Sequence, residues 1–355
     1  MLDMSNILIR SSSKSYSVTF SEDLNELIDE TSFFIVDRAL SSHRWVRQLD
    51  PKRVISVDGS ESTKTIEFAA SLLEQLATLG ATRKNRLVAV GGGSVQDATT
   101  LCASLYMRGL PWIFVPSTYM SMADSCIGGK SAINVGEHKN LAGNFYPPDK
   151  IIINESFLES LGKAGIGAGL CEAVKIQIAK GPEEFQEFRI EYEEYCKSGK
   201  ITHLINIATM SLTTKKWFVE VDEFDQNERK LLNYGHSFGH ALESASGMSV
   251  PHGLAIGLGM IVANSLMQKT EYLEAVNSTV SEILKRSEFL FSEMVFDVDK
   301  FKDALKMDKK NSRGMQTLVL PDDTGRLSLR TQPFTDSDFD LQAQALMTAI
   351  REVSS

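Results

Sequence analysis

The feature that most constrains the fold is an alternation of short apolar runs with helix-patterned segments over the first 150 residues. Four runs have the length and the continuous apolar character of strands buried on both faces of a parallel sheet: "FFIVD" (33–37), "RVISVD" (53–58), "RLVAVGGG" (86–93) and "PWIFVPST" (111–118). Segment 62–81, between the second and third runs, has apolar residues at helical spacing, among them Ile66, Ala69 and Leu73. The pattern predicts parallel βαβ units.

From about residue 155 the pattern changes to helical periodicity with few strand signals, as in "GIGAGLCEAVK" (165–175) and "HGLAIGLGMIVANSL" (252–266). A Pro-rich stretch, "FYPPDK" (145–150), precedes this change and is typical of a crossing between domains. We therefore predict an α/β, Rossmann-like domain at residues 1–155 and an all-α domain at residues 156–355.

The charge balance limits the kinds of partner. Acidic residues outnumber basic ones, 46 to 37, for a formal charge of −9, which argues against nucleic acid or an anionic membrane as the main partner. A small basic pocket could still bind a phosphorylated metabolite. The four cysteines show no paired spacing, and no apolar run is long enough to span a bilayer, so we expect a protein of the cytoplasm with reduced thiols.

Three glycines, Gly91 to Gly93, follow the third predicted strand and precede a predicted helix. Backbone can approach a phosphate closely at such a place, and the helix N-terminus favours negative charge. The spacing differs from GxGxxG, so the motif alone is a weak signal. We favour ligand contact over the alternative, a tight turn that needs glycines at positive φ.

The stretch 116–148 is a second candidate for ligand binding. We predict a polar, glycine-rich loop whose lysine and amide side chains suit an oxygen-rich, phosphorylated ligand; its polar residues include Asp124, Lys130, Asn134, Lys139 and Asn140. The alternative is a solvated surface loop.

Two of the six histidines, His236 and His240, stand four residues apart, and His252 follows soon after. On a helix the pair would share one face, about 6 Å apart along the axis. Zn²⁺ prefers histidine and carboxylate ligands, and Glu172, on an otherwise apolar stretch, is a candidate carboxylate. The alternatives are a hydrogen-bonded structural histidine at His252 and an ordinary ion pair between Glu172 and Lys175.

These stretches together resemble the sugar phosphate cyclases, and among them most closely the 3-dehydroquinate synthase family. The resemblance covers most of the chain and runs in one order through "GSESTK", "GGGSVQD", "DSCIGGKSAIN", "GLCEAVK", "LLNYGHSFGHALE", "PHG" and "MDKKN".

The resemblance implies a set of site residues. The family's metal ligands fall on Glu172, His236 and His252. Its NAD contacts fall on Asp37, Glu61, Lys64, Gly92, Gly93, Ser94, Asp97, Ser117, Thr118 and Lys130, with Lys139 beside the nicotinamide pocket. Its substrate contacts fall on Asp124, Lys130, Asn140, Lys175, Lys215, Arg229, Asn233 and His240, with Arg108 and either Lys309 or Lys310 as further phosphate partners.

The resemblance also implies the chemistry. Such an enzyme binds NAD in domain 1–155 and a divalent metal, Zn²⁺ or Co²⁺, in domain 156–355. It converts 3-deoxy-D-arabino-heptulosonate 7-phosphate to 3-dehydroquinate, a step of the shikimate pathway, with loss of phosphate. NAD⁺ takes a hydride and returns it within one turnover, which makes NAD a cofactor, and the metal acts as a Lewis acid on substrate oxygens. The resemblance further implies a homodimer.

Some residues depart from the family's usual pattern, and they keep two alternatives open. Ser94, Gln96, Tyr119, Met122 and Leu254 differ from the usual residues without removing a metal ligand or a phosphate lysine. Related cyclases that act on sedoheptulose 7-phosphate or glucose 6-phosphate would share the fold and the cofactors. The "GGGSVQDATT" stretch also resembles iron- or zinc-dependent alcohol and glycerol dehydrogenases, which would produce NADH and release no phosphate.

Overall fold

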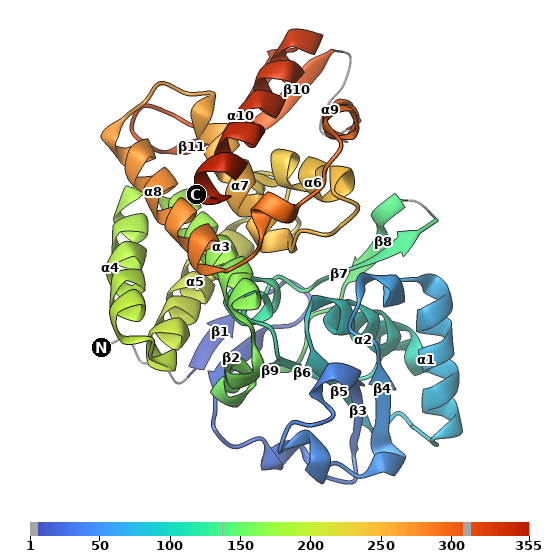
Figure 1. Ribbon diagram of the computed structural model, residues 1–355. Coiled ribbons are helices and arrows are strands. Elements are labelled where there is room, and N and C mark those ends of the chain that lie inside the picture. Colours follow the sequence, from blue (N-terminus) through green and yellow to red (C-terminus); the bar gives the residue numbers. More distant parts are fainter. Residues whose placement is uncertain (1–5, 137, 308–313, 355) are drawn as a thin grey trace. The chain divides into compact units, whose positions relative to one another are not determined.

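The computed structural model describes residues 6–136, 138–307 and 314–354. The chain divides into two compact units, Met1–Leu161 and Gly162–Ser355, called here the N-terminal and C-terminal units. Figure 1 colours the first from blue to green and the second from green to red. The predicted boundary, between residues 155 and 156, lies at the start of the 3-10 turn η8 (Glu155–Ser160), which precedes the division.

In the described part of the N-terminal unit, one seven-stranded sheet has the order β1-β2-β9-β6-β5-β3-β4. Neighbouring strands are parallel except for β1 and β2. The strands are β1 Asn6–Ile9, β2 Tyr16–Phe20, β3 Ser32–Asp37, β4 Val54–Val57, β5 Arg86–Gly91, β6 Trp112–Pro116 and β9 Lys150–Ile153. The four predicted strands are confirmed as β3, β4, β5 and β6, and the Rossmann-like α/β class with them.

The strand order creates a switch point at β3 and β5. Strand β3 lies between β4 and β5 in the sheet. The chain runs from β3 to β4 on one side, whereas from β5 it runs to β6 on the opposite side, so the connections that leave the neighbouring strands β3 and β5 diverge. Open α/β sheets bind ligands at such points, outside the carboxyl ends of the strands. Two helices complete the crossovers: α1 (Ile66–Thr78), which begins where Thr65 Oγ1 accepts a hydrogen bond of 3.1 Å from Phe68 N, and α2 (Gly93–Leu105).

The stretch 116–148, predicted as a polar loop, contains regular secondary structure instead. It contains a π-helical turn, η7 (Ser121–Ser125), and an antiparallel hairpin of β7 (Lys130–Val135) and β8 (His138–Phe145). Most described residues of β8 are exposed. A hairpin with little buried surface lacks the apolar alternation by which strands are predicted, and this explains the error.

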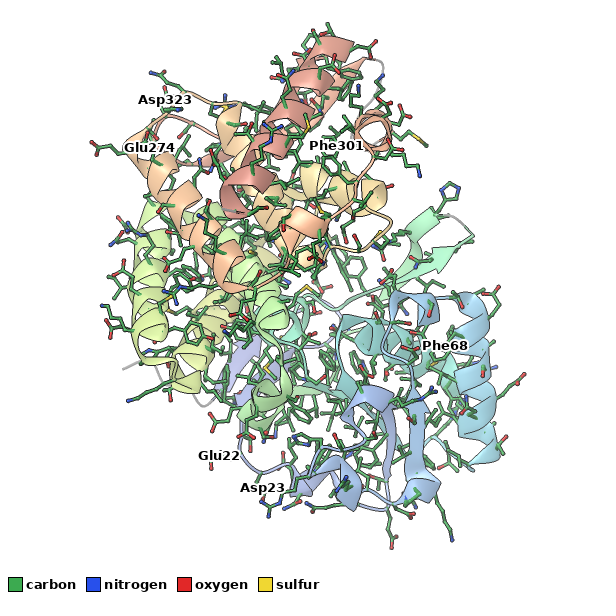
Figure 2. All side chains as sticks on the ribbon, in the orientation of Figure 1. Glu22, Asp23, Phe68, Glu274, Phe301 and Asp323 are labelled. Carbon is green, nitrogen blue, oxygen red and sulfur yellow. The ribbon has the colours of Figure 1, made fainter. Side chains whose placement is uncertain are left out.

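In the C-terminal unit the described helices are α3 Lys163–Lys180, α4 Pro182–Ser198, α5 Ile201–Val221, α6 His236–Ala245, α7 His252–Ser265, α8 Glu271–Arg286, α9 Val298–Lys306 and α10 Asp336–Ser354. The helical class is confirmed. The all-α prediction missed one antiparallel hairpin, β10 (Met315–Pro321) with β11 (Leu327–Pro333). Phe301, labelled in Figure 2, is a fully buried core residue on α9. Among the described residues, no helix combines the length and apolar character needed to cross a membrane.

Helix α7 is the most enclosed element of this unit and determines how α6 is held. Its residues from Gly253 to Asn264 are all buried, as expected of a helix that is apolar on every face. A Cβ at Gly259 would overlap the carbonyl oxygen of Gly235, the residue with φ +77° that precedes α6. The backbone of α7 therefore packs directly against the turn from which α6 starts.

Candidate active site

Asp37 ends β3, at the switch point of the sheet. Its Oδ1 accepts a hydrogen bond of 3.0 Å from the backbone N–H of Ala39. Gly59 lies so close that a Cβ there would overlap the Asp37 carboxylate. The carboxylate is thus held at the strand end, where it suits a ribose hydroxyl.

The glycine loop stands beside it. Gly91 ends β5, Gly92 caps α2 without a side-chain hydrogen bond, and Gly93 is the first residue of the helix. None of these three glycines has a positive φ, so the tight-turn alternative is wrong. Glycine is needed at Gly92 because there is little room for a side chain: a Cβ there would lie 3.0 Å from Thr118 Cγ2. The first N–H groups of α2 are available to an anion, as phosphate-binding helix ends require.

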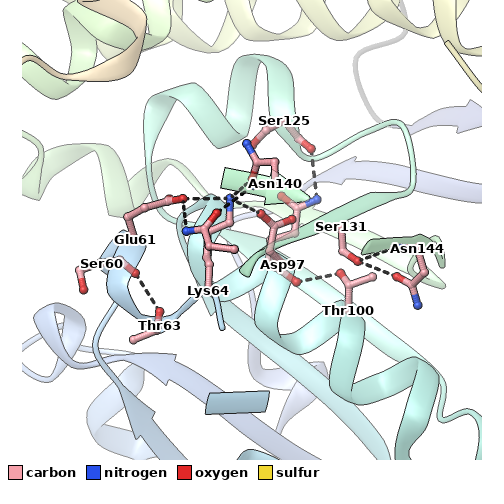
Figure 3. Close-up of polar contacts among 12 residues, drawn as sticks. Ser60, Glu61, Thr63, Lys64, Asp97, Thr100, Ser125, Ser131, Asn140 and Asn144 are labelled. Atoms are coloured by element: carbon pink, nitrogen blue, oxygen red, sulfur yellow. Dashed lines mark hydrogen bonds and ion pairs between the residues drawn. The ribbon is translucent and has the colours of Figure 1, made fainter. Parts of the chain in front are cut away.

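Lys64 is the centre of a polar network, shown in Figure 3. Its Nζ lies 2.9 Å from Asp97 Oδ2 and 3.5 Å from Glu61 Oε1, and it donates a hydrogen bond of 2.9 Å to Asn140 Oδ1. Asn134 extends the network, because its Nδ2 donates to Glu61 Oε1 at 3.0 Å and its Oδ1 accepts from Asn140 N at 2.9 Å. One ammonium group thereby joins the 61–64 turn, helix α2 and strand β8.

Within this network Asp97 is a weaker acid than an ordinary aspartate. Burial raises the pKa of its carboxyl group to about 6, although the charge of Lys64 opposes the rise. The group therefore changes charge close to neutral pH.

The other predicted residues of the N-terminal unit lie around the sheet's ligand-binding edge or on the hairpin, with one exception. Ser94 is in the first turn of α2; Ser117, whose N–H donates to the Gly91 carbonyl at 2.9 Å, and Thr118 follow β6. Asp124 is in η7, Lys130 begins β7 and Lys139 is in β8. Arg108, with φ +69°, follows the far end of α2, about 20 Å along the helix from the glycine loop, so the structure does not bring it to the network.

Three histidines of the C-terminal unit converge. One ring nitrogen from each of His236, His240 and His252 lies within 4.8 Å of the other two. His236 and His252 are the first residues of α6 and α7, and His240 follows His236 by one helical turn. The Oε1 atom of Glu172, on α3, lies 3.4 Å from His252 Nε2. Imidazoles with one carboxylate are a donor set that fits Zn²⁺ or Co²⁺.

Both ring nitrogens of His252 face carboxylates. Nδ1 lies 3.2 Å from Glu243 Oε2, and Nε2 faces Glu172. Burial lowers the pKa of His252, but the hydrogen bond with Glu243 and the charges of Glu172 and Glu243 outweigh it and raise the pKa above its ordinary value. Glu243 was not among the site residues predicted from the sequence. Its spacing, seven residues after His236 and on the same helix face, was the available signal.

Three basic side chains of this unit are buried: Lys175, Lys215 and Arg229 are 3%, 7% and 5% exposed. Lys175 donates to Glu172 Oε2, and Arg229 Nη1 donates to the Glu223 carbonyl at 2.6 Å. Lysine and arginine side chains are seldom buried this deeply, and three of them in one domain suit the binding of an anionic ligand. Asn233 lies in η9 (Glu228–Asn233), where its Nδ2 donates to the Lys230 carbonyl at 3.1 Å. Lys309 and Lys310 lie outside the described residues.

The family of the chain follows from its relatives. Residues 54–168 match the family described as 3-dehydroquinate synthase N-terminal, and residues 169–311 match that described as 3-dehydroquinate synthase C-terminal. The 3-dehydroquinate synthase of Dictyoglomus turgidum is 36% identical over 282 residues, 78% of either chain, and that of a Sulfurovum species is 32% identical over 293 residues, 81% of either chain. The chain belongs to the 3-dehydroquinate synthase family, which confirms the predicted resemblance.

Solved structures share the fold. A 2-epi-5-epi-valiolone synthase from Streptomyces hygroscopicus, solved with NAD⁺ and Zn²⁺, has a TM-score of 0.79 at 22% identity, covering 96% of this chain and 98% of that one. A 2-deoxy-scyllo-inosose synthase, solved with carbaglucose-6-phosphate, NAD⁺ and Co²⁺, has a TM-score of 0.78 at 22% identity, covering 96% and 99%. An iron-containing alcohol dehydrogenase from Thermotoga maritima has a TM-score of 0.64 at 15% identity, covering 93% and 97%.

Proposed function

We propose that this protein is a 3-dehydroquinate synthase that converts 3-deoxy-D-arabino-heptulosonate 7-phosphate to 3-dehydroquinate and inorganic phosphate, with NAD and a divalent metal as cofactors. One observation carries the proposal: the C-terminal unit holds a histidine cluster and Glu172 together with three buried basic side chains. Metal ligands and phosphate-binding cations in one domain suit a phosphorylated, oxygen-rich substrate. Membership of the family supports the choice of substrate.

Glu172, His236 and His252 would hold the metal, Zn²⁺ or Co²⁺. The metal supplies a Lewis acid for substrate oxygens when bound. His240 lies within the same cluster and would contact the substrate. Assigning three ligands rather than four leaves room for substrate, as a catalytic site requires.

The N-terminal unit would bind NAD at its switch point. Asp37 would contact a ribose hydroxyl, and the N–H groups after Gly92 would bind the pyrophosphate. NAD supplies a reversible hydride acceptor and is regenerated in each turnover. Further contacts would come from the Lys64 network and the adjacent turns, through Glu61, Lys64, Gly93, Ser94, Asp97, Ser117, Thr118, Lys130 and Lys139.

The buried cations would hold the phosphate. When the bond between substrate carbon and phosphate oxygen breaks, the electron pair leaves with the phosphate, and Lys175, Lys215 and Arg229 would offset its charge. Their burial in the folded chain would limit the reorganisation that accompanies the elimination. Asp124, Lys130, Asn140 and Asn233 would bind further substrate oxygens, with Lys309 or Lys310 as an additional phosphate contact.

We also propose a homodimer that works in the cytoplasm without a nucleic-acid or membrane partner. The four cysteines are free thiols, which suits a reducing compartment, and the net charge of −9 disfavours polyanions. Light scattering of the purified protein tests the dimer against the chain mass of 39.3 kDa. A species of single-chain mass would contradict it.

The function is tested by phosphate release from the metal-loaded protein with catalytic NAD⁺. Three substrates are offered in parallel: 3-deoxy-D-arabino-heptulosonate 7-phosphate, sedoheptulose 7-phosphate and glucose 6-phosphate. Release from the first alone supports the proposal, and release from either of the others reassigns the enzyme to another cyclase branch. No release, with NADH accumulating on glycerol, would identify a dehydrogenase instead.

A further inference from the structure

Glu243 is a buried carboxylate outside the proposed metal and substrate contacts. It lies on α6, three residues after His240 and seven after His236, so the three side chains share one helix face. Only 9% of Glu243 is exposed. A carboxylate this deep is costly unless it is paired or hydrogen-bonded.

The imidazole of His252 is such a partner, because Glu243 Oε2 lies 3.2 Å from its Nδ1. A neutral imidazole carries one N–H, and an ionised carboxylate can only accept. Glu243 can therefore hold the ring by accepting a hydrogen from Nδ1, which leaves Nε2 as the nitrogen for a metal ion. That nitrogen faces Glu172 Oε1 at 3.4 Å.

The packing of α6 on α7 does not depend on this pair. A Cβ at Gly259 would overlap the Gly235 carbonyl, and a Cβ at Gly239 would press on the side chain of Ile256. Close backbone contact, with the apolar surface of α7 around it, already holds the two helices together. A purely structural explanation for Glu243 is therefore weak.

We propose that Glu243 is a positioning residue: it fixes the tautomer and orientation of the His252 ring and so strengthens divalent-metal binding. The inference rests on the proposed metal site and deepens it. Carboxylates that accept a hydrogen bond from a metal-binding histidine commonly change metal affinity about 10- to 100-fold when removed.

The test compares wild type with Glu243→Ala, Glu243→Gln and a matched control, Ser246→Ala. Ser246 Oγ donates to the Glu243 carbonyl at 3.2 Å, so the control removes a buried hydrogen bond at the same turn without touching His252. The Zn²⁺ dissociation constant is measured on metal-stripped protein by chelator competition. The histidine ¹⁵N spectrum of the same protein, recorded at a pH at which the His252 ring is neutral, reports the tautomer.

We expect Glu243→Ala to weaken Zn²⁺ binding about 10- to 100-fold. Glu243→Gln, which keeps a neutral acceptor, should show a smaller loss, and Ser246→Ala none. We expect wild-type His252 to carry its hydrogen on Nδ1 and the alanine variant to lose that preference.

Equal Zn²⁺ affinity in wild type and Glu243→Ala would overturn this inference alone. A wild-type His252 with its hydrogen on Nε2 would also overturn it. If the alanine variant does not fold, the wild-type tautomer and the Zn²⁺ affinity of the glutamine variant together test the inference. A wild-type protein that binds no divalent ion would overturn both the inference and the proposed function.

Discussion

The two units assemble their candidate sites by different physical means. In the N-terminal unit the site lies at strand ends and combines main chain, in a glycine loop and an uncapped helix end, with the side-chain network around Lys64. In the C-terminal unit it is made of side chains that project from buried helices, and carboxylates face both nitrogens of one ring. The first site depends on the course of the main chain as well as on side chains, and the second on the side chains at a few helix positions.

The largest expected effect comes from removing a proposed metal ligand, which should abolish the C-terminal site and leave the N-terminal site intact. In His252→Ala we expect loss of bound metal and a fall of at least about 1,000-fold in phosphate release, because a ligand and its Lewis-acid chemistry are removed. NAD binding should not change. Metal analysis, phosphate release and NADH fluorescence titration measure the three quantities.

The matched control is His203→Ala. His203, on α5, pairs with Glu191 at 2.7 Å and has no proposed role in the site, so this variant should keep its metal. A His252→Ala protein that retains one metal per chain would contradict the assignment.

The second expected effect concerns stability. In Gly259→Ala the new methyl group would overlap the Gly235 carbonyl, so we expect a loss of about 1–3 kcal/mol in the free energy of unfolding and weaker metal binding. Gly162→Ala serves as control, because its Cβ would meet nothing within 4 Å; its cost should stay below about 1 kcal/mol. Urea unfolding measures both variants, and equal stability of the two would show that the helices can separate without penalty.

The third prediction applies to the N-terminal unit. Lys64→Met leaves Asp97 and Glu61 without their shared ammonium group, and we expect NAD affinity to fall about 10- to 100-fold while metal content stays unchanged. Lys84→Met, at an exposed lysine, is the control. An unchanged NAD dissociation constant in Lys64→Met would show that the network does not support the cofactor site.

The smallest expected effect is a pH dependence. The folded pKa of Asp97, about 6, lies above the ordinary value of 3.8, so the folded state holds this proton to higher pH than the unfolded state does. Its contribution to the free energy of unfolding is therefore full below pH 3.8 and is lost as the pH rises through 6, by about 1.4 kcal/mol between pH 5 and 7.

The measurement is the difference in unfolding free energy between wild type and Asp97→Asn at several pH values. We expect the stability of wild type relative to the variant to decline between pH 4 and 6 and to level off above pH 7. A difference that grows with pH would contradict the prediction, because it would mean that Lys64 outweighs burial and holds the folded pKa of Asp97 below 3.8.

This difference between the two units also explains which features the sequence could predict. Strands β3 and β5 are continuous apolar runs, and Gly91–Gly93 follow directly, so both the sheet and the loop were predictable. The spacing of His236 and His240 predicted a shared helix face. Spacing along one helix could not predict that α7 packs on α6, and the pairing of Glu243 with His252 depends on that packing.

The two missed hairpins have different causes. The β7–β8 hairpin is polar and mostly exposed, so it carried no periodic signal. The β10–β11 hairpin did carry one: "DDTG" (322–325), with Gly325 at φ +82°, is a turn sequence between two runs of strand-forming residues. The weight of the surrounding helical pattern led to the all-α prediction.

The enclosure of α7 has a thermodynamic consequence. His252 begins a helix that neither turns nor slides without displacing its neighbours, and its ring already contacts carboxylates on two other helices. The loss of conformational freedom that a metal site requires is therefore incurred when the chain folds. We expect the ion to bind a site that is largely ordered beforehand, with a small entropic penalty.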